Sequence, residues 1–182
     1  MSLTQRRVYR TLHRMRPLRS IRLGTAALLL CASLVCAQAS QEIKLAVTGD
    51  VPTPLTLSAS DLAAMPRDHF ELAEQDGEKI TYEGVPLQEI LKKAGISFGH
   101  DLRGKALAGY VLAEASDGYE VVFSLGELDP GLGGEKVIVA DKRDGKPLFP
   151  YQGPVRLVVT GDKEGARSVR MLQKLEVVKL RK

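Results

Sequence analysis

The chain has 182 residues and a formal net charge of +4, but its excess of basic residues is confined to the N-terminal part. Residues 1–39 contain seven arginines and no acidic residue, which leaves 19 basic and 22 acidic side chains in residues 40–182, a formal charge of −3. That part gives no support for nucleic-acid binding, and because Cys31 and Cys36 both precede it, it offers no disulfide, thiolate metal site or cysteine nucleophile.

Residues 1–39 have the pattern of a signal peptide. The arginines precede an uncharged, mostly apolar run of 16 residues from Gly24 to Ala39, which ends in an Ala-x-Ala cleavage site at Ala37 and Ala39. The run is shorter than the ~20 residues of a membrane-spanning helix, so an uncleaved anchor is the second interpretation. We predict cleavage after Ala39 and a periplasmic protein with no membrane insertion after cleavage.

Residues 40–182 have the length of one domain with its own core. No repeat and no low-complexity linker divides them. We therefore predict a single domain over 40–182. Export by the Sec or the Tat route stays open, and so does translation from Met1 or from Met15.

The first half of this domain predicts short strands and two small helices. Alternation of apolar and polar residues over 42–49 predicts a half-buried strand, and residues 69–84 predict a hairpin about an Asp-Gly turn at 76–77. Ser58 predicts the N-cap of a helix that ends before Pro66. The segment "VPLQEILKKAG", residues 85–95, predicts an amphipathic helix with a proline at its start and a glycine at its stop.

The second half repeats this pattern with more strands. The strands are predicted over 106–115, 119–124, 135–141, 154–162 and 175–180. Turns are predicted at 117–118 and 142–148, and a short helical turn at 125–134. The predicted fold class is α+β, with mixed or antiparallel sheets and a few short helices.

The segment "VIVADKRDGKPLFPYQGPVRLVVTGDKEGARSVRMLQKLEV" resembles the end of the molybdopterin-binding domain of the sulfite oxidase family. The shared features are an Asp-Gly-x-Pro-Leu turn, a Pro-x-Arg strand and a Gly-x-Arg-x-Val loop. Upstream, "DGYEVVFSLGEL" and "YEGVPLQEILKKAGI" resemble earlier segments of that family. The resemblance is strong over 136–177 and weak over 43–180.

The resemblance implies a pterin site that holds a phosphate group. Carried over by motif, the cofactor-binding residues are Arg156, Arg167, Ser168 and Arg170. Guanidinium groups bind phosphate through paired hydrogen bonds, which suits this role. A short helix expected over residues 168–172, "SVRML", would add backbone amides to the same anion site.

The chain departs from the family where the metal is held. Enzymes of this kind bind molybdenum through one cysteine thiolate, and at that place this chain has Ala113, Glu114 and Ala115 within "YVLAEASDGY". None of these side chains supplies the soft sulfur ligand. The family's histidine ahead of the Pro-x-Arg strand is replaced by Tyr151 or Gln152. No metal-ligating residue and no catalytic residue is assigned.

The arginines also have a purely structural interpretation. Arg167 and Arg170 would pair with Asp162 and Glu164 on a solvated turn, and such surface pairs contribute ~0–1 kcal/mol. Arg156 would lie on the polar face of an edge strand.

Other chemistries have weaker support. His69 and His100 are isolated in the sequence, as expected of solvated or core-edge histidines. One predicted turn is surrounded by three acidic residues, Glu114, Asp117 and Glu120. One of them could act as a general base, but an acidic turn of this kind is usually a solvated surface feature.

Two function classes therefore stay open. The first is an exported, oxidoreductase-like protein of the sulfite oxidase fold that binds a molybdopterin-type cofactor through the arginine anion site, without complete redox catalysis of its own. The second is a non-catalytic periplasmic module that binds a small anion or a protein partner. The missing cysteine favours a pseudoenzyme, and the sequence leaves enzymatic activity undecided.

Overall fold

A computed structural model describes residues 42–73 and 77–180, which belong to one compact unit. The predicted signal peptide and the predicted turn residue Asp76 lie outside the described residues. In the described part of the chain, no helix has both the length and the apolar character needed to cross a membrane.

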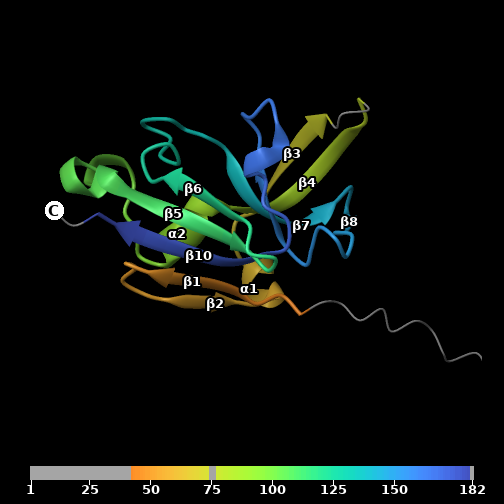
Figure 1. The fold of residues 1–182 in the computed structure, drawn as a ribbon, viewed down its shortest axis with the longest axis horizontal. Coiled ribbons are helices and arrows are strands. Elements are labelled where there is room, and N and C mark those ends of the chain that lie inside the picture. Colours follow the sequence, from red (N-terminus) through yellow and green to blue (C-terminus); the bar gives the residue numbers. More distant parts are fainter. Residues whose placement is uncertain (1–41, 74–76, 181–182) are drawn as a thin grey trace, which may run out of the picture. The chain divides into compact units, whose positions relative to one another are not determined.

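The first sheet has five strands in the order β2-β1-β10-β5-β6 (Figure 1). Its strands are β1 (Leu45–Gly49), β2 (Leu55–Leu57), β5 (Gly109–Ala115), β6 (Glu120–Ser124) and β10 (Leu172–Lys179). β1 and β10 are parallel, whereas all other neighbours in this sheet are antiparallel. The sheet is therefore mixed, and its central strand is the last one in the chain.

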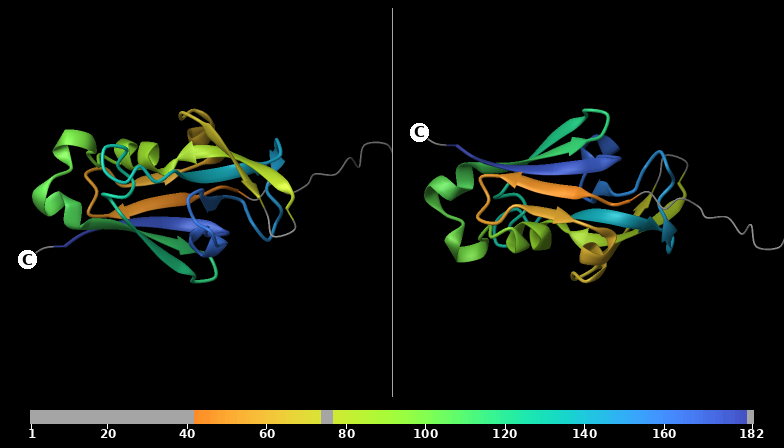
Figure 2. Two further views of the ribbon diagram at one scale, coloured as in Figure 1. Left: turned by 90° about the horizontal axis from the view of Figure 1, so that it is seen from above. Right: turned by 90° about the horizontal axis from the view of Figure 1, so that it is seen from below.

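The second sheet is antiparallel throughout. Its strands are β3 (Asp68–Ala73), β4 (Lys79–Pro86), β7 (Val137–Arg143), β8 (Lys146–Pro147) and β9 (Arg156–Val159). β7 pairs with β4, and it also pairs with β9 through residues 137–140 and with β8 through residues 142–143. β3 and β4 form the predicted hairpin. Figure 2 shows the strands of both sheets from two further sides.

Two short α-helices connect the strands, α1 (Ala59–Ala63) and α2 (Leu87–Lys93). Ser58 caps α1 as predicted, since its hydroxyl accepts a hydrogen bond from the Asp61 amide and the Asp61 carboxylate accepts one from the Ser58 amide. α2 follows directly on Pro86. It ends before Gly95, whose φ of +88° suits glycine best.

The helix predicted over residues 168–172 is not present. The chain forms a single 3₁₀ turn, η3 (Gly165–Arg167), and then bends through residues 168–171 before β10 begins. The reason is that backbone groups here bond to other segments: the Val169 carbonyl accepts a hydrogen bond from the Leu157 amide at 2.7 Å. The helix-amide contribution to an anion site therefore does not exist.

Several other predicted elements differ in extent from the observed ones: the strand predicted over 154–162 is β9 over Arg156–Val159, and the one predicted over 175–180 is β10 over Leu172–Lys179. The strand predicted over 106–115 begins only at Gly109, because residues 104–108 form a 3₁₀ helix, η2 (Gly104–Ala108), after the short η1 (Gly99–Asp101). The segment 125–134 consists of turns without a helix.

The second sheet is buried on both faces along β9 and the first half of β7, and this places the candidate site. In β7, Val137 and Val139 belong to the main core, which also contains residues of the first sheet and α2. Their neighbours Ile138 and Ala140 belong to a second cluster that includes Tyr82. The predicted fold class is confirmed: α+β, with one mixed and one antiparallel sheet and few helices.

Candidate functional site

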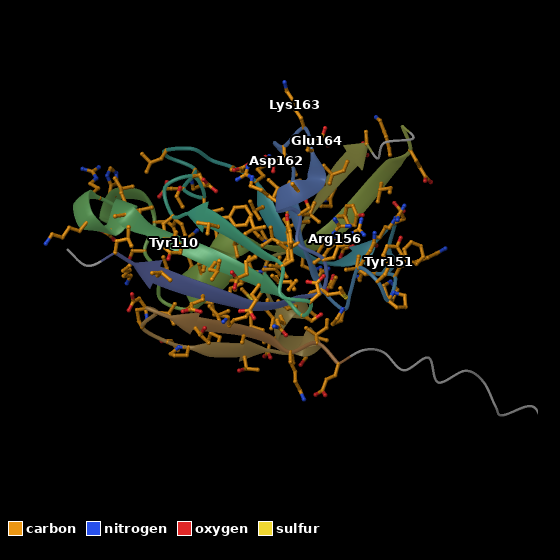
Figure 3. The ribbon with its side chains drawn as sticks, viewed as in Figure 1. Tyr110, Tyr151, Arg156, Asp162, Lys163 and Glu164 are labelled. Atoms are coloured by element: carbon orange, nitrogen blue, oxygen red, sulfur yellow. The ribbon has the colours of Figure 1, made fainter. Side chains whose placement is uncertain are left out.

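A pocket of about 590 Å³ lies between the β3–β4 hairpin and the segment that follows β9. Three of the four predicted binding residues line it, Arg156, Ser168 and Arg170. Leu72 and Val159 give it an apolar wall. Figure 3 shows Arg156 below the segment that carries the labelled residues 162–164.

Arg156 is the deepest cation of the pocket, with 8% of its surface exposed. Its Nη1 donates a hydrogen bond to the Tyr82 hydroxyl at 2.9 Å, and its guanidinium carbon lies 4.7 Å from the centroid of the Tyr82 ring. Both residues project from the face of the second sheet that bears the smaller cluster: Tyr82 belongs to that cluster, and Arg156 lies two residues from its member Val158 in β9, so the two side chains share a face. β9 pairs with β7 alone among the described strands, as expected of an edge strand, but the polar face predicted for Arg156 is wrong because the side chain is buried.

Ser168 joins the pocket wall to β9. Its Oγ accepts a hydrogen bond from the Val159 amide at 3.1 Å. A serine hydroxyl has one hydrogen to donate besides its acceptor sites. Ser168 can therefore donate to an anion in the pocket while it keeps its place against the strand.

Arg170 stands at the exposed rim of the pocket. Its guanidinium carbon lies 5.7 Å from the centroid of the Tyr151 ring. The alternative pairing with Glu164 is not found among the ion pairs of the described residues, none of which includes Arg170. The side chain therefore has a positive charge and hydrogen-bond donors to offer a ligand.

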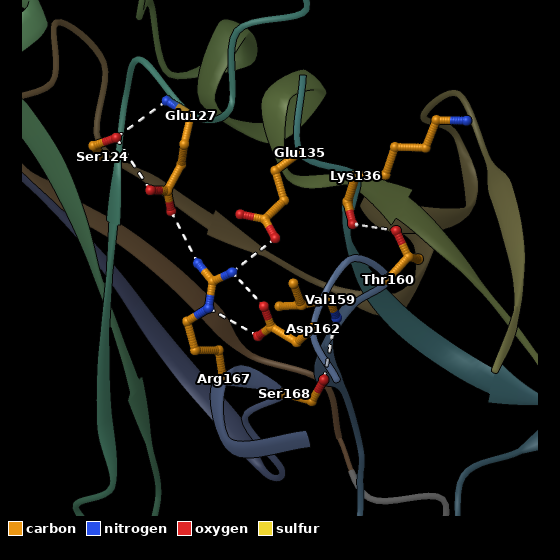
Figure 4. Close-up of polar contacts among 9 residues, drawn as sticks. All are labelled: Ser124, Glu127, Glu135, Lys136, Val159, Thr160, Asp162, Arg167 and Ser168. Atoms are coloured by element: carbon orange, nitrogen blue, oxygen red, sulfur yellow. Dashed lines mark hydrogen bonds and ion pairs between the residues drawn. The ribbon is translucent and has the colours of Figure 1, made fainter. Parts of the chain in front are cut away.

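Arg167 has a different environment from the other two arginines, and it does not line this pocket. Figure 4 shows its guanidinium group among three carboxylates. Nε and Nη2 contact Asp162 at 2.8 and 2.5 Å, Nη2 contacts Glu135 at 2.7 Å, and Nη1 contacts Glu127 at 3.3 Å. Pairing of Arg167 with Asp162, the structural alternative, is confirmed.

We refer to Arg167 and its three partners Glu127, Glu135 and Asp162 as the Arg167 cluster. The cluster joins the segment after β6, the residues before β7 and the segment after β9. Hydrogen bonds to Asp162 and then to Glu135 raise the pKa of the guanidinium group above its ordinary value. One positive charge faces three carboxylates, so an added anion would be repelled. Four of its five N–H donors are engaged by these carboxylates, so Arg167 positions the segment after β9.

Residues 33–182 match the family described as the oxidoreductase molybdopterin binding domain. The chain belongs to this family. Its fold also resembles the crystal structure of the sulfane dehydrogenase SoxCD from Paracoccus pantotrophus, with a TM-score of 0.60 and 22% identity. The matched region covers 76% of this chain and 38% of that one, so the chain spans well under half of the neighbour's length. The comparison with curated proteins found no match.

The residues at the family's metal position do not fit a thiolate-held molybdenum ion. Residues 40–182 contain no cysteine. In β5, Ala113 and Ala115 point into the main core, and Glu114 between them forms an ion pair with Lys174 at 2.6 Å. The hydrogen bond from Lys174 lowers the pKa of Glu114, which also makes this carboxyl a poor general base at neutral pH.

Gln152 is one of the two residues, with Tyr151, that the resemblance sets at the place of the family's histidine. It is 2% exposed, and its backbone carbonyl accepts a hydrogen bond from the Met171 amide at 2.9 Å. Its side-chain Oε1 is buried, with no hydrogen-bond partner in the described part of the chain. An amide does not titrate in the range where histidine does, so no acid–base group stands here.

The other candidate groups have structural roles. Asp117 accepts a hydrogen bond from the Tyr119 amide within its turn, and His100 contacts Arg103 at 2.7 Å. The described residues contain no group of three or more His, Cys, Asp or Glu side chains that could hold a metal ion.

Sequence reasoning missed Tyr82 as a residue of the pocket. The alternation of β4 indicates only that Tyr82 shares a face with Ile80. Its contact with Arg156 depends on β7, which lies between β4 and β9 in the sheet. That pairing joins residues 74 positions apart in the sequence, so no local pattern predicts it.

Proposed function

We propose that this chain is an exported, non-redox member of its family that binds a phosphate-bearing pterin-type molecule in the pocket lined by Arg156, Ser168 and Arg170. The observation that carries the proposal is the convergence of these three donors on one pocket, next to the apolar side chains of Leu72 and Val159. A molecule with a charged end and an uncharged body matches both parts of the lining.

The electrostatics of the pocket favour an anion. Arg156 is buried, so its field is screened less by water than that of a surface arginine. Three further charged residues line the pocket, Asp162, Lys163 and Glu164. The charge of Asp162 is engaged by Arg167, and the formal charges of Lys163 and Glu164 cancel, so the two arginines leave the lining positive. Arg170 carries a second positive charge at the rim, where it can contact a phosphate oxygen directly.

The proposal excludes complete molybdenum chemistry from the chain alone. In this family a thiolate-held molybdenum centre supplies oxygen-atom transfer, and residues 40–182 contain no cysteine to hold the metal. We therefore expect no oxidation of sulfite by the purified protein. Export to the periplasm is part of the proposal because residues 1–39 have the pattern of a signal peptide.

Titration calorimetry of the purified protein tests the anion site. The ligands are 6-hydroxymethylpterin phosphate and inorganic phosphate, and the variants are Arg170→Ala and a control, Lys105→Ala, which removes an exposed cation from η2. Loss of a hydrogen bond to a charged group is worth ~1.5–3 kcal/mol, so Arg170→Ala should weaken binding about 10- to 150-fold.

The control should bind like the wild type, and binding should weaken as salt is added. Binding of inorganic phosphate as tight as that of the pterin phosphate would favour the simpler alternative, a module for a small anion. No heat with either ligand would contradict both, and would leave the arginines with structural roles.

A further inference from the structure

Two exposed aromatic rings stand beside the pocket. Phe149 and Tyr151 are 49% and 55% exposed, and their rings stack with centroids 5.7 Å apart and planes 7° from parallel. The guanidinium carbon of Arg143 lies 5.3 Å from the Phe149 centroid, and that of Arg170 lies 5.7 Å from the Tyr151 centroid. We refer to these four residues as the aromatic ladder.

Arg170 belongs to both the aromatic ladder and the pocket lining. The two regions are therefore continuous. Figure 3 shows the labelled Tyr151 on the side of Arg156 that leads to the β8 hairpin.

The backbone fixes Tyr151 next to Arg170. Met171 has a φ of 47°, in the left-handed region that residues other than glycine rarely adopt. Its amide donates a hydrogen bond to the carbonyl of Gln152 at 2.9 Å, which joins the segment after Arg170 to the segment that carries Tyr151. A left-handed residue other than glycine persists only where the surrounding structure fixes it. Here the hydrogen bond to Gln152 fixes Met171 and keeps the two segments together.

We infer that Tyr151 and Arg170 hold the ring of a planar heterocycle whose phosphate is bound in the pocket. Aromatic faces and guanidinium planes both stack on such rings. A ring placed between the two side chains needs only a small outward movement of Arg170, which is exposed and free of ion pairs to carboxylates of the described residues. The ligand class is a phosphorylated planar heterocycle, either a pterin phosphate or a nucleotide.

This inference rests on the proposed function, because the phosphate must occupy the pocket. It goes further by assigning part of the recognition to Tyr151, outside the pocket lining. Tyr119, the second exposed tyrosine among the described residues, has a different role, since its hydroxyl donates to the Ala166 carbonyl at 2.7 Å.

The test compares ligands with and without a ring. Calorimetric titrations use 6-hydroxymethylpterin phosphate, guanosine 5′-monophosphate and ribose 5-phosphate, which has the phosphate but no aromatic ring. The variants are Tyr151→Ala, Tyr151→Phe, which keeps the aromatic face, and Tyr110→Ala, a tyrosine of β5 that does not line the pocket. Thermal unfolding of each variant shows that it is folded.

The wild type should bind one of the two ring-bearing ligands about tenfold or more tightly than ribose 5-phosphate, and that ligand identifies the heterocycle. Tyr151→Ala should abolish this advantage and leave the affinity for ribose 5-phosphate unchanged. Tyr151→Phe and Tyr110→Ala should keep it. The pterin fluorescence should be quenched in the wild type and less so in Tyr151→Ala.

The inference and the proposed function fail in different ways. Equal affinity for all three phosphates, unaffected by Tyr151→Ala, would overturn the inference while the anion site stands. No binding of any phosphate to the wild type would overturn the proposed function and the inference with it.

Discussion

Replacement of Arg167 by alanine should destabilise the fold rather than weaken ligand binding at the pocket rim. The guanidinium group contacts Asp162, Glu135 and Glu127, which come from three different segments. Its side chain is 33% exposed, so these contacts are partly screened by water. Without the cation, the three carboxylates would remain close together and repel one another.

We expect Arg167→Ala to lower the free energy of unfolding by about 3 kcal/mol. Two well-formed charged hydrogen bonds contribute ~1.5–3 kcal/mol each before screening, and like-charge repulsion adds to their loss. Urea denaturation at two salt concentrations measures the change. The difference from wild type should shrink in high salt, because the interactions are between charges.

Arg170→Ala is the matched control, since it removes an exposed arginine three residues away and should change stability by less than about 0.5 kcal/mol. If Arg167→Ala were as stable as this control, the cluster would contribute nothing. The assignment of Arg167 to positioning, and not to ligand binding, would then be wrong.

Three further outcomes are expected. Tyr82→Phe removes the acceptor of the Arg156 Nη1 hydrogen bond and should lower the free energy of unfolding by about 1.5 kcal/mol in urea titrations, whereas an unchanged value would show that the hydroxyl is dispensable. The hydrogen bond from the Ser58 hydroxyl lowers the pKa of Asp61 below its ordinary value. The stability that Asp61 contributes is therefore complete above that ordinary value and lost as the pH falls through the lower folded pKa, so wild type and Asp61→Asn should differ at neutral pH and converge once the pH is below that folded pKa. A difference that did not vary with pH would contradict this. Sulfite should not reduce a synthetic electron acceptor in the presence of the purified, molybdenum-treated protein, and sustained turnover would show that the missing thiolate is not essential.

The local parts of the fold were predictable because their causes are local. Ser58 and Asp61 are three residues apart and form the capping box on their own, and Gly95 ends α2 through its own backbone conformation. The alternation of β1 predicts which of its side chains share the buried face.

The roles of the arginines needed the tertiary structure. Arg167 meets Asp162 five residues away, as a sequence argument allows, but its contacts with Glu135 and Glu127 span 32 and 40 residues. Nothing in the Gly-x-Arg-x-Val motif indicates these distant carboxylates. The missing helix has a similar cause, because the backbone of residues 168–171 bonds to β9 and to the loop at Gln152.

The aromatic ladder could not be predicted from the sequence either. Phe149 and Tyr151 have the sequence pattern of a loop. Backbone hydrogen bonds from Met171 to Gln152 and from Leu172 to Val155 bring that loop beside Arg170. The continuity between the pocket and these rings is therefore a property of the folded chain alone.

Metal and ligand analysis of the protein purified from its own cells tests the central claim most directly. The protein is denatured, and the released molecules are separated and identified by mass and fluorescence while molybdenum is measured by elemental analysis. The account predicts a phosphorylated pterin or nucleotide without molybdenum, and less of it in protein with Arg170→Ala. Molybdenum at one equivalent per chain would contradict the account, since residues 40–182 contain no cysteine to hold it.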